Sequence, residues 1–344
     1  MNLYDENGFL NFRAIKKLGL PFNFIVGGRG TGKTYSGLKT TVEDGDTFLF
    51  MRRTQSQADL INKPEFSPFK ALNRDTGWFI GSKQITKYNS GFYHMEQNAE
   101  TGKFDPVGLP IGYTCALSTI SNMRGFDASD CTVMIYDEFI PEKHERPLKH
   151  EATAFFNAYE TVNRNRELVG RKPLQVFGLA NSNDIANPIF IELGLVKKCE
   201  NMVKRGKEFS IDRERGIGLF LLTESPISEQ KRNTALYRLT MDNEFSKMAI
   251  ENSFLTETKN VVSRNLIEYR PVVSVGEICI YTHKNNAKLY VSTHTSGSPT
   301  KFGAGETELD RFRRAYSWIW FEYMANNVDF EEILCEILLT KYLK

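Results

Sequence analysis

The eight residues at 27–34, GGRGTGKT, constrain the fold more than any other part of the chain. They follow a short apolar run at 22–26, FNFIV, and precede a helix-compatible stretch at 35–43, YSGLKTTVE. This spacing fits the GxxxxGK[ST] phosphate-binding loop that joins a strand to a helix. A chance glycine-rich turn is the alternative, but the correct flanks favour a nucleotide-binding α/β domain.

Each residue type in this loop has a physical role. Glycines let backbone N–H groups turn inward around phosphate oxygens, and the N-terminus of the next helix adds positive potential. Lys33 is placed to reach the β- and γ-phosphates, and the Thr34 hydroxyl to ligate Mg²⁺. We therefore expect ATP to bind at Gly27, Gly28, Arg29, Gly30, Thr31, Gly32, Lys33 and Thr34.

Two adjacent acids form the second signal. The apolar run at 133–136, VMIY, leads directly into Asp137 and Glu138. Asp137 is expected to hold the Mg²⁺ shell, and Glu138 to polarise a water for attack on the γ-phosphate. Such a pair alone more often decorates a helix N-terminus. Downstream of a phosphate-binding loop it favours hydrolysis over kinase action, because a kinase must keep water away.

Further short apolar runs at 47–51, 174–183 and 218–225 resemble strands buried on both faces of a parallel sheet. The segment at 150–168 has helical spacing and suits the crossover helix that parallel strands need. Residues 81–118 alternate β-prone pieces with turn residues, which predicts an antiparallel hairpin insertion. The fold class is α/β, a parallel sheet flanked by helices.

The pattern changes after this sheet. Polar helix with no long apolar strand fills 226–258, which reads as a linker or lid. Three strand patterns at 270–275, 276–283 and 288–294 and two helical patterns at 311–327 and 330–343 follow. We expect an ATPase domain at 1–225, a helical linker at 226–258 and a small α+β domain at 259–344.

Composition narrows the class of protein. The 41% apolar content and 12% aromatic share exclude disorder, and the net charge of +2 excludes a histone-like nucleic-acid binder. The chain has five cysteines and no CxxC pair, a pattern that predicts neither a disulfide framework nor a zinc ribbon. The chain start lacks a signal sequence and no run approaches a membrane span, so we expect a cytosolic protein without membrane contact.

Arginines and an asparagine complete the candidate site. A guanidinium can stabilise charge on the transferring phosphoryl group, and Arg29, the pair Arg52 and Arg53, and Arg164 with Arg166 qualify. We count Arg29 as catalytic and Arg53 as ATP-binding. Asn181 ends the fourth strand pattern, where it could sense the γ-phosphate. Surface salt bridges for the arginines and a turn for Asn181 are equally open.

With these residues described, the chain resembles the DNA-packaging motor ATPases of phi29-type podoviruses, which are related to large terminases. The resemblance rests on FNFIVGGRGTGKT, FLFMRRT, TVMIYDEFIPEK, ETVNRNREL and LANSNDIANPIF, in that order, from about residue 20 to 190. The pieces TMDNEF and GEICIYTHKNNAKLYVSTH are similar to the family's linker and C-terminal domain more loosely.

This resemblance implies a P-loop NTPase fold of the ASCE type and a ring motor, a homopentamer docked on the portal of a procapsid in the host cytoplasm. Such a motor translocates double-stranded viral DNA by Mg²⁺-dependent ATP hydrolysis, in some cases with a scaffold RNA. The family's trans-acting arginine falls on Arg164, and a second trans candidate falls on Arg124.

The C-terminal domain in this family is similar to an RNase H-like nuclease. Terminase nucleases hold metal with clustered acids, whereas the strand pattern at 270–283 carries only Glu277. We therefore expect no nuclease activity. Arg311, Arg313, Arg314 and the lysines near 197–207 are the basic surface signals, for which a solvated helix face is equally open.

Two rival functions remain. A helicase or recombinase-like ATPase would need exposed aromatics along a basic groove, but the aromatics here lie mostly in apolar runs. A non-hydrolysing, nucleotide-dependent structural protein would not need Glu138, and the acid pair argues against it.

Overall fold

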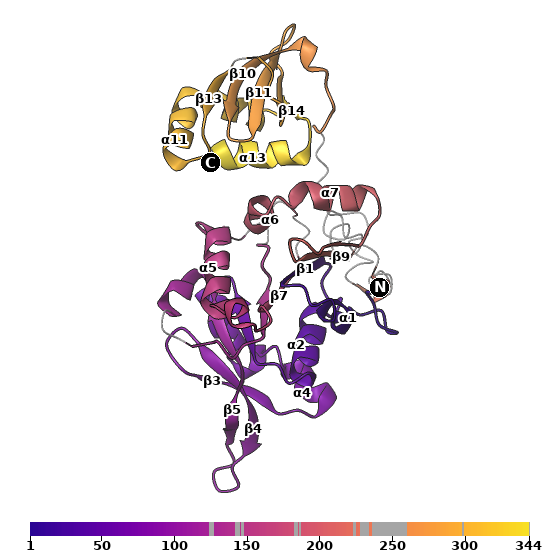
Figure 1. The fold of residues 1–344 in the computed structure, drawn as a ribbon, viewed down its shortest axis with the longest axis vertical. Coiled ribbons are helices and arrows are strands. Elements are labelled where there is room, and N and C mark those ends of the chain that lie inside the picture. The colour runs from indigo at the N-terminus through magenta and orange to yellow at the C-terminus, as the bar shows by residue number, and fades with distance from the viewer. Residues whose placement is uncertain are drawn as a thin grey trace. The chain divides into compact units, whose positions relative to one another are not determined.

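The computed structural model describes residues 1–123, 127–141, 145, 148–181, 185, 187–222, 225–227, 234–235, 260–297 and 299–343. The chain divides into two compact units, Met1–Phe254 and Leu255–Lys344. Each unit has its own sheet (Figure 1). In the described part of the chain, no helix has the length and apolar character needed to cross a membrane.

The larger unit is built on a nine-stranded sheet of order β3-β4-β5-β2-β6-β7-β1-β9-β8. The six strands from β5 to β9 in this order are parallel, and antiparallel pairing occurs only toward the two edges. The strands are β1 (Phe22–Gly27), β2 (Phe48–Arg52), β3 (Ile80–Gln84), β4 (Ser90–Gln97), β5 (Phe104–Ala116), β6 (Val133–Asp137), β7 (Gln175–Ala180), β8 (Phe209–Asp212) and β9 (Ile217–Leu222).

All five apolar runs are strands of the parallel core, as predicted: β1, β2, β6, β7 and β9. The predicted hairpin insertion is a meander of β3, β4 and β5. Its last strand also pairs in parallel with β2, which extends the main sheet. The short edge strand β8 was not predicted, because four partly exposed residues give a weak alternation signal.

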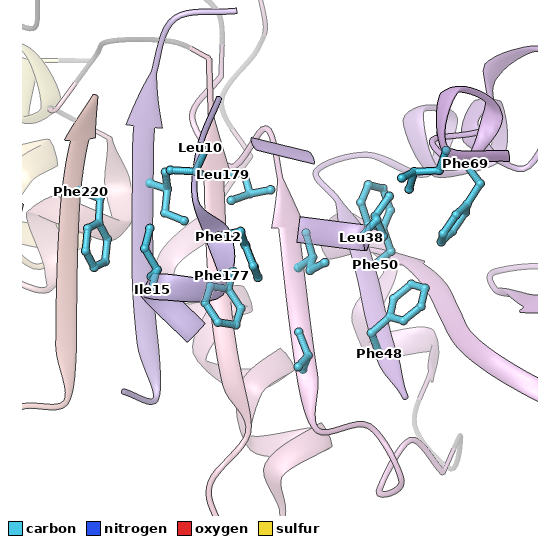
Figure 2. Close-up of a cluster of buried hydrophobic side chains, with 14 of the residues drawn as sticks. Leu10, Phe12, Ile15, Leu38, Phe48, Phe50, Phe69, Phe177, Leu179 and Phe220 are labelled. Carbon is cyan, nitrogen blue, oxygen red and sulfur yellow. The ribbon is translucent and has the colours of Figure 1, made fainter. Parts of the chain in front are cut away.

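Helices cover both faces of this sheet. On one face, Phe12 of α1 (Phe12–Lys16) and Leu38 of α2 (Lys33–Glu43) share a buried cluster with strand residues such as Ile25 and Phe50 (Figure 2). On the other face, Phe24 of β1 contacts Phe155 and Phe190, at ring-centroid distances of 6.3 and 5.3 Å. Successive strand residues thus point into two different cores.

The second face is covered by α5 (Glu151–Asn163) and α6 (Pro188–Glu192), which carry these two phenylalanines. The crossover helix expected at 150–168 is thus α5 followed by a short 3₁₀ turn, η3 (Glu167–Val169). The remaining short elements of this unit are α3 (Gln55–Ile61), η1 (Pro64–Phe66), α4 (Lys70–Thr76), η2 (Leu117–Met123) and α7 (Val196–Lys204).

The smaller unit has a five-stranded sheet of order β13-β10-β11-β12-β14. The three predicted strands are β10 (Tyr269–Val275), β11 (Ile278–His283) and β12 (Leu289–Ser292), preceded by η4 (Leu266–Glu268). Two three-residue strands, β13 (Thr300–Phe302) and β14 (Val328–Phe330), were too short to predict. The sheet agrees with an α+β unit, and its RNase H-like nature stays a prediction.

The helical pattern at 311–327 divides into α11 (Glu306–Ala315) and α12 (Trp318–Met324). The break falls at Tyr316, whose backbone leaves the helical region and whose ring stacks on Phe312 at 5.8 Å. The last helix is α13 (Ile333–Leu343), within the predicted 330–343. The predicted linker at 226–258 lies almost wholly outside the described residues.

Candidate functional site

The glycine-rich loop connects the carboxyl end of β1 to α2. Gly30 and Gly32 adopt φ values of 73° and 81°, a conformation that favours glycine. Gly32 is also the N-cap of α2 and has no side chain to cap it. The N-terminus of α2 therefore faces the loop, and the positive end of the helix dipole favours an anion there.

Lys33 is buried at the centre of the loop. Its ammonium donates hydrogen bonds to the carbonyl oxygens of Gly27 and Gly28, each at 2.8 Å, and to the Thr31 hydroxyl at 3.2 Å. A cation held by neutral carbonyl groups can exchange them for phosphate oxygens, because charge-assisted hydrogen bonds are stronger. The loop thus presents one buried positive charge at the anion position.

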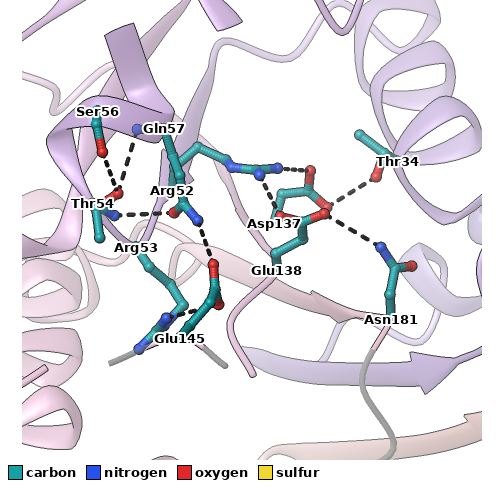
Figure 3. A network of polar contacts seen from close by, with 10 residues as sticks. All are labelled: Thr34, Arg52, Arg53, Thr54, Ser56, Gln57, Asp137, Glu138, Glu145 and Asn181. Atoms are coloured by element: carbon teal, nitrogen blue, oxygen red, sulfur yellow. Dashed lines mark hydrogen bonds and ion pairs between the residues drawn. The ribbon is translucent and has the colours of Figure 1, made fainter. Parts of the chain in front are cut away.

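Asp137 joins the loop to the end of β6. Its carboxylate accepts a 2.9 Å hydrogen bond from the Thr34 hydroxyl and a 2.7 Å ion pair from Arg52 (Figure 3). Thr34 lies in the first turn of α2, which follows β1. Asp137 ends β6, which lies two positions from β1 in the sheet, so only the tertiary fold brings the two residues together. Oxygen donors of this kind suit Mg²⁺, and these two residues could hold it.

Glu138 stands directly after the strand in a left-handed conformation, with φ of 55°. This conformation is costly for a residue other than glycine and is typical of functional positions. One carboxylate oxygen is ion-paired with Arg52, and the other accepts a 3.4 Å hydrogen bond from the Asn181 amide (Figure 3). The carboxyl ends of the parallel strands β1, β6 and β7 therefore bring together four residues of the predicted site, Lys33, Asp137, Glu138 and Asn181.

Arg53 does not reach these acids. It is fully buried and makes a double hydrogen bond with Glu151 of α5, at 2.7 and 3.2 Å, and a 3.2 Å ion pair with Glu145. Burial disfavours the guanidinium charge, but the contact with Glu151 outweighs it, so the pKa of Arg53 is raised. Its neighbour Arg52, which we named as a candidate in the pair but did not assign to ATP, takes the place by the acids.

A register signal could have identified Arg52. Strands β2 and β6 are parallel, and Met51 lies beside Tyr136. The next residue of each strand is Arg52 and Asp137, so both side chains point to the same face. Sequence periodicity alone cannot give this register, because it does not show which strands are neighbours.

The segment after α5 separates its two arginines. Arg164 has an unusual backbone, with φ of 47° and ψ of −134°, and its half-exposed guanidinium lies 3.4 Å from Asp127. Hydrogen bonds from Ser129 lower the pKa of Asp127, and Arg164 adds to this effect. Arg166 is buried and donates to the backbone carbonyls of Ser129 and Cys131.

Two other arginines, Arg29 and Arg124, were predicted to act at the site. Arg29 is exposed on the loop, and Arg124 lies outside the described residues. Within the described ranges, no group of three or more His, Cys, Asp and Glu side chains is arranged to hold a metal ion. Any cation at this site would thus rely on Thr34, Asp137 and the ligand's own oxygens.

Comparison with known proteins shows the family of this chain. The family model of the podovirus DNA encapsidation protein (Gp16) matches residues 4–302. The DNA packaging protein of Bacillus phage phi29 is 22% identical over 299 residues, which cover 84% of this chain and 80% of the relative. That of Bacillus phage B103 is 25% identical over 258 residues, covering 74% and 70%.

Solved structures agree on the fold. The Phi-28 gp11 DNA packaging motor matches with a TM-score of 0.65 at 18% identity, over 98% of both chains. The packaging motor assembly of bacteriophage Phi-29 matches with a TM-score of 0.63 at 17% identity, over 98% of this chain and 99% of that one. Both similarities extend through the two units of the chain.

Proposed function

Because this chain belongs to the podovirus DNA encapsidation protein (Gp16) family, we propose that it is the ATP-hydrolysing subunit of a motor that moves double-stranded viral DNA into a procapsid. The observation that carries this proposal is the meeting of Lys33, Thr34, Asp137 and Glu138 at one edge of a parallel sheet. This is a P-loop NTPase arrangement, which we assign to the ASCE type.

Nucleotide binding follows from the loop. The backbone N–H groups of residues 27–34 and the Lys33 ammonium bind the phosphates, and Lys33 exchanges its carbonyl partners for phosphate oxygens. Thr34 and Asp137 would hold Mg²⁺ together with the nucleotide, and the metal would supply charge neutralisation to the phosphates. Arg29, exposed on the same loop, is proposed as a catalytic cation that approaches these phosphates from solvent.

Glu138 is the base that takes a proton from the attacking water. Its left-handed backbone directs the carboxylate away from the strand, toward Arg52 and Asn181. A carboxylate can accept about four hydrogen bonds and the Glu138 side chain is 38% exposed, so an attacking water can hydrogen-bond with it alongside these partners. A bound γ-phosphate competes for the same cation, so nucleotide binding itself favours release of the carboxylate from Arg52.

A second subunit completes the site. Arg164 stands at the end of α5 on a turn and is half exposed. It makes a 3.4 Å ion pair with Asp127 and a 3.4 Å hydrogen bond to the Thr161 carbonyl, contacts weak enough to suit a guanidinium that acts on a neighbour's phosphates. Arg124 is a second trans candidate. A ring, pentameric by family resemblance, would couple hydrolysis in one subunit to contact with the next.

A mixing experiment tests this arrangement. Arg164→Ala subunits keep their own loop and base, whereas Glu138→Gln subunits keep the arginine. Each variant alone should hydrolyse ATP poorly, and mixed rings should recover part of the rate, because some interfaces then pair an intact base with an intact arginine. Assembled mixed rings without any recovery would count against the trans role.

The smaller unit is assigned to partners. We propose an RNase H-like domain at 259–344 without nuclease activity, joined through 226–258 to the ATPase domain at 1–225. It contacts DNA, the procapsid portal or a scaffold RNA, in the host cytoplasm and without a membrane. Its acid Asp329 is buried and paired with Arg264 at 2.9 Å and Lys288 at 2.7 Å, which favours a structural role for this carboxylate.

The decisive measurement is steady-state ATP hydrolysis with Mg²⁺, in the presence of linear double-stranded DNA, single-stranded DNA or neither. Stimulation by duplex DNA that disappears in Glu138→Gln would support a double-strand translocase. Stimulation by single strands alone would point to a helicase instead. If the Glu138→Gln variant still supported DNA packaging without ATP hydrolysis, a structural protein would be favoured instead.

A further inference from the structure

A pocket of about 630 Å³ lies beside the glycine-rich loop in the larger unit. The residues that line this pocket do not include the acids Asp137 and Glu138. Its walls come from four places in the sequence: residues 5–13, Gly30 and Gly32 of the loop, the turns of α2 from Tyr35 to Glu43, and the end of α4. Its volume is in the range typical of small-molecule sites.

The pocket begins where the phosphate site ends. Gly32 lines the pocket and is also the N-cap of α2, where an anion would bind. Tyr35 and Ser36, in the first turn of the same helix, line it as well. The pocket therefore adjoins the position where the phosphates of a bound ligand would lie.

The chemistry of the walls is aromatic with a polar rim. Phe9 is 38% exposed, and its ring lies directly over Gly32, where an added Cβ would stand 3.2 Å from it. Tyr35 donates a 3.2 Å hydrogen bond to Asp75, which is also paired with Arg74. An aromatic surface edged by charged and hydroxyl groups matches a flat heterocyclic base joined to a polar sugar.

Phe9 is held in place before any ligand arrives. The Asp5 carboxylate accepts hydrogen bonds from the backbone N–H groups of Asn7 and Phe9, each at 2.9 Å, and Leu10 N–H donates to the Thr31 carbonyl at 2.9 Å. The N-terminal segment is thus tied to the phosphate loop itself. Preorganisation of this kind lowers the entropy cost of binding.

We propose that this pocket binds the nucleoside end of the nucleotide, with Phe9 as a stacking surface for the base. The assignment rests on the proposed function, because it presumes that the loop binds the triphosphate. It adds a site formed by the N-terminal segment, which the GxxxxGK[ST] spacing does not include.

The test compares two ligands that share their phosphates. Dissociation constants for ATP and for inorganic tripolyphosphate, both with Mg²⁺, are measured by calorimetry on the full chain and on Phe9→Ala. Loss of one stacked base should weaken ATP by about 5- to 150-fold and leave tripolyphosphate unchanged. Phe9→Tyr, which keeps the ring, should restore ATP affinity.

A matched control is Phe79→Ala, which removes another exposed phenylalanine that stacks on Phe104 instead. It should change neither constant. Unchanged ATP affinity in Phe9→Ala, or an equal loss for both ligands, would overturn the proposal, since the second result makes Phe9 a support of the loop. A wild-type chain that binds neither ligand would overturn the phosphate site and the pocket with it.

Discussion

At the scale of single residues, the adjacent arginines Arg52 and Arg53 show how a strand assigns chemistry. Successive side chains of a strand point to opposite faces. Arg52 consequently meets Asp137 and Glu138 at the proposed catalytic edge, whereas Arg53 enters the core beneath α5 and meets Glu151. Two identical side chains one position apart thus take different roles, one at the site and one in the core.

The different surroundings of Arg52 and Arg53 predict different effects of two matched substitutions on stability and on ATP hydrolysis. Arg53→Met leaves Glu151 buried without its cation and should lower the free energy of unfolding by about 3–5 kcal/mol. Arg52→Met removes the cation beside the largely buried Asp137 and should cost less stability, about 1–3 kcal/mol, while mainly altering ATP hydrolysis. Urea denaturation and steady-state rates measure both effects. Combining Arg53→Met with Glu151→Leu should recover stability, and a stable Arg53→Met single variant would contradict this account.

Glu336 in the smaller unit predicts a pH dependence. Burial in α13 raises the pKa of Glu336, and the hydrogen bond that its carboxylate accepts from Tyr323 offsets this only in part. The folded-state pKa therefore exceeds the unfolded value, so the ionised form opposes folding. The contribution of Glu336 to the stability of this unit should therefore fall as the pH rises from the unfolded pKa through the folded one.

Glu336→Gln should remove this loss and raise the stability of the smaller unit at pH 7, because glutamine can still accept from Tyr323. Thermal unfolding at pH 4 and pH 7 measures the difference. Glu268→Gln, at an exposed carboxylate, is the control and should leave the pH trend unchanged. A wild-type unit that gains stability from pH 4 to pH 7 through Glu336 would have the opposite sign to this prediction.

At the scale of elements, the turn after α5 places one arginine inside the protein and another on its surface. Arg166 is fixed inside by the carbonyls of Ser129 and Cys131, and Asn163 accepts a 2.8 Å hydrogen bond from Leu174 N–H. These contacts connect the turn to the segment before β6. They leave Arg164 on the outside with a strained backbone, which the anchored turn can maintain.

We expect the two arginines to separate stability from activity. Arg166→Ala removes the donor to the buried Cys131 carbonyl, whereas Arg171 still reaches the Ser129 carbonyl at 3.4 Å, and it should lower the free energy of unfolding by about 1–3 kcal/mol. Arg164→Ala should stay within about 0.5 kcal/mol of the wild type while ATP hydrolysis in assembled rings falls. Denaturation curves of the two variants decide this. Equal destabilisation would mean that Arg164 is a structural residue.

At the scale of the whole molecule, the chain contains two sheets with separate cores. Ile135 lies in the core of the nine-stranded sheet and Ile280 in that of the five-stranded sheet, and both are fully buried. Units with separate cores generally unfold as separate cooperative transitions. The proposed motor needs such independence, because one unit binds nucleotide while the other is assigned to partners.

Calorimetry can detect this separation with one pair of substitutions. Ile135→Ala and Ile280→Ala should each cost about 2–5 kcal/mol in their own unit. The first should lower only the transition that Mg²⁺ and ATP stabilise, and the second only the other transition. If either substitution shifts both transitions together, the two units unfold as one, and the division at residues 254 and 255 has no thermodynamic meaning.

The amino-acid sequence alone determined the parallel strands, the phosphate-binding loop and the acids Asp137 and Glu138. These features depend on local physics, because apolar runs report burial and glycine spacing reports a turn conformation. Segments such as β1 and α2 are therefore readable within a few residues of their observed ends. The resemblance to the packaging family rested on the same local motifs.

Only the tertiary structure decided which side chains meet. Arg52 and Asp137 are 85 residues apart and come together through the register of β2 and β6. Phe9 approaches Gly32 because the N-terminal segment hydrogen-bonds to the loop. Short edge strands such as β14 form because a neighbouring strand is available. Such contacts depend on strand order and long-range pairing, which no local pattern encodes.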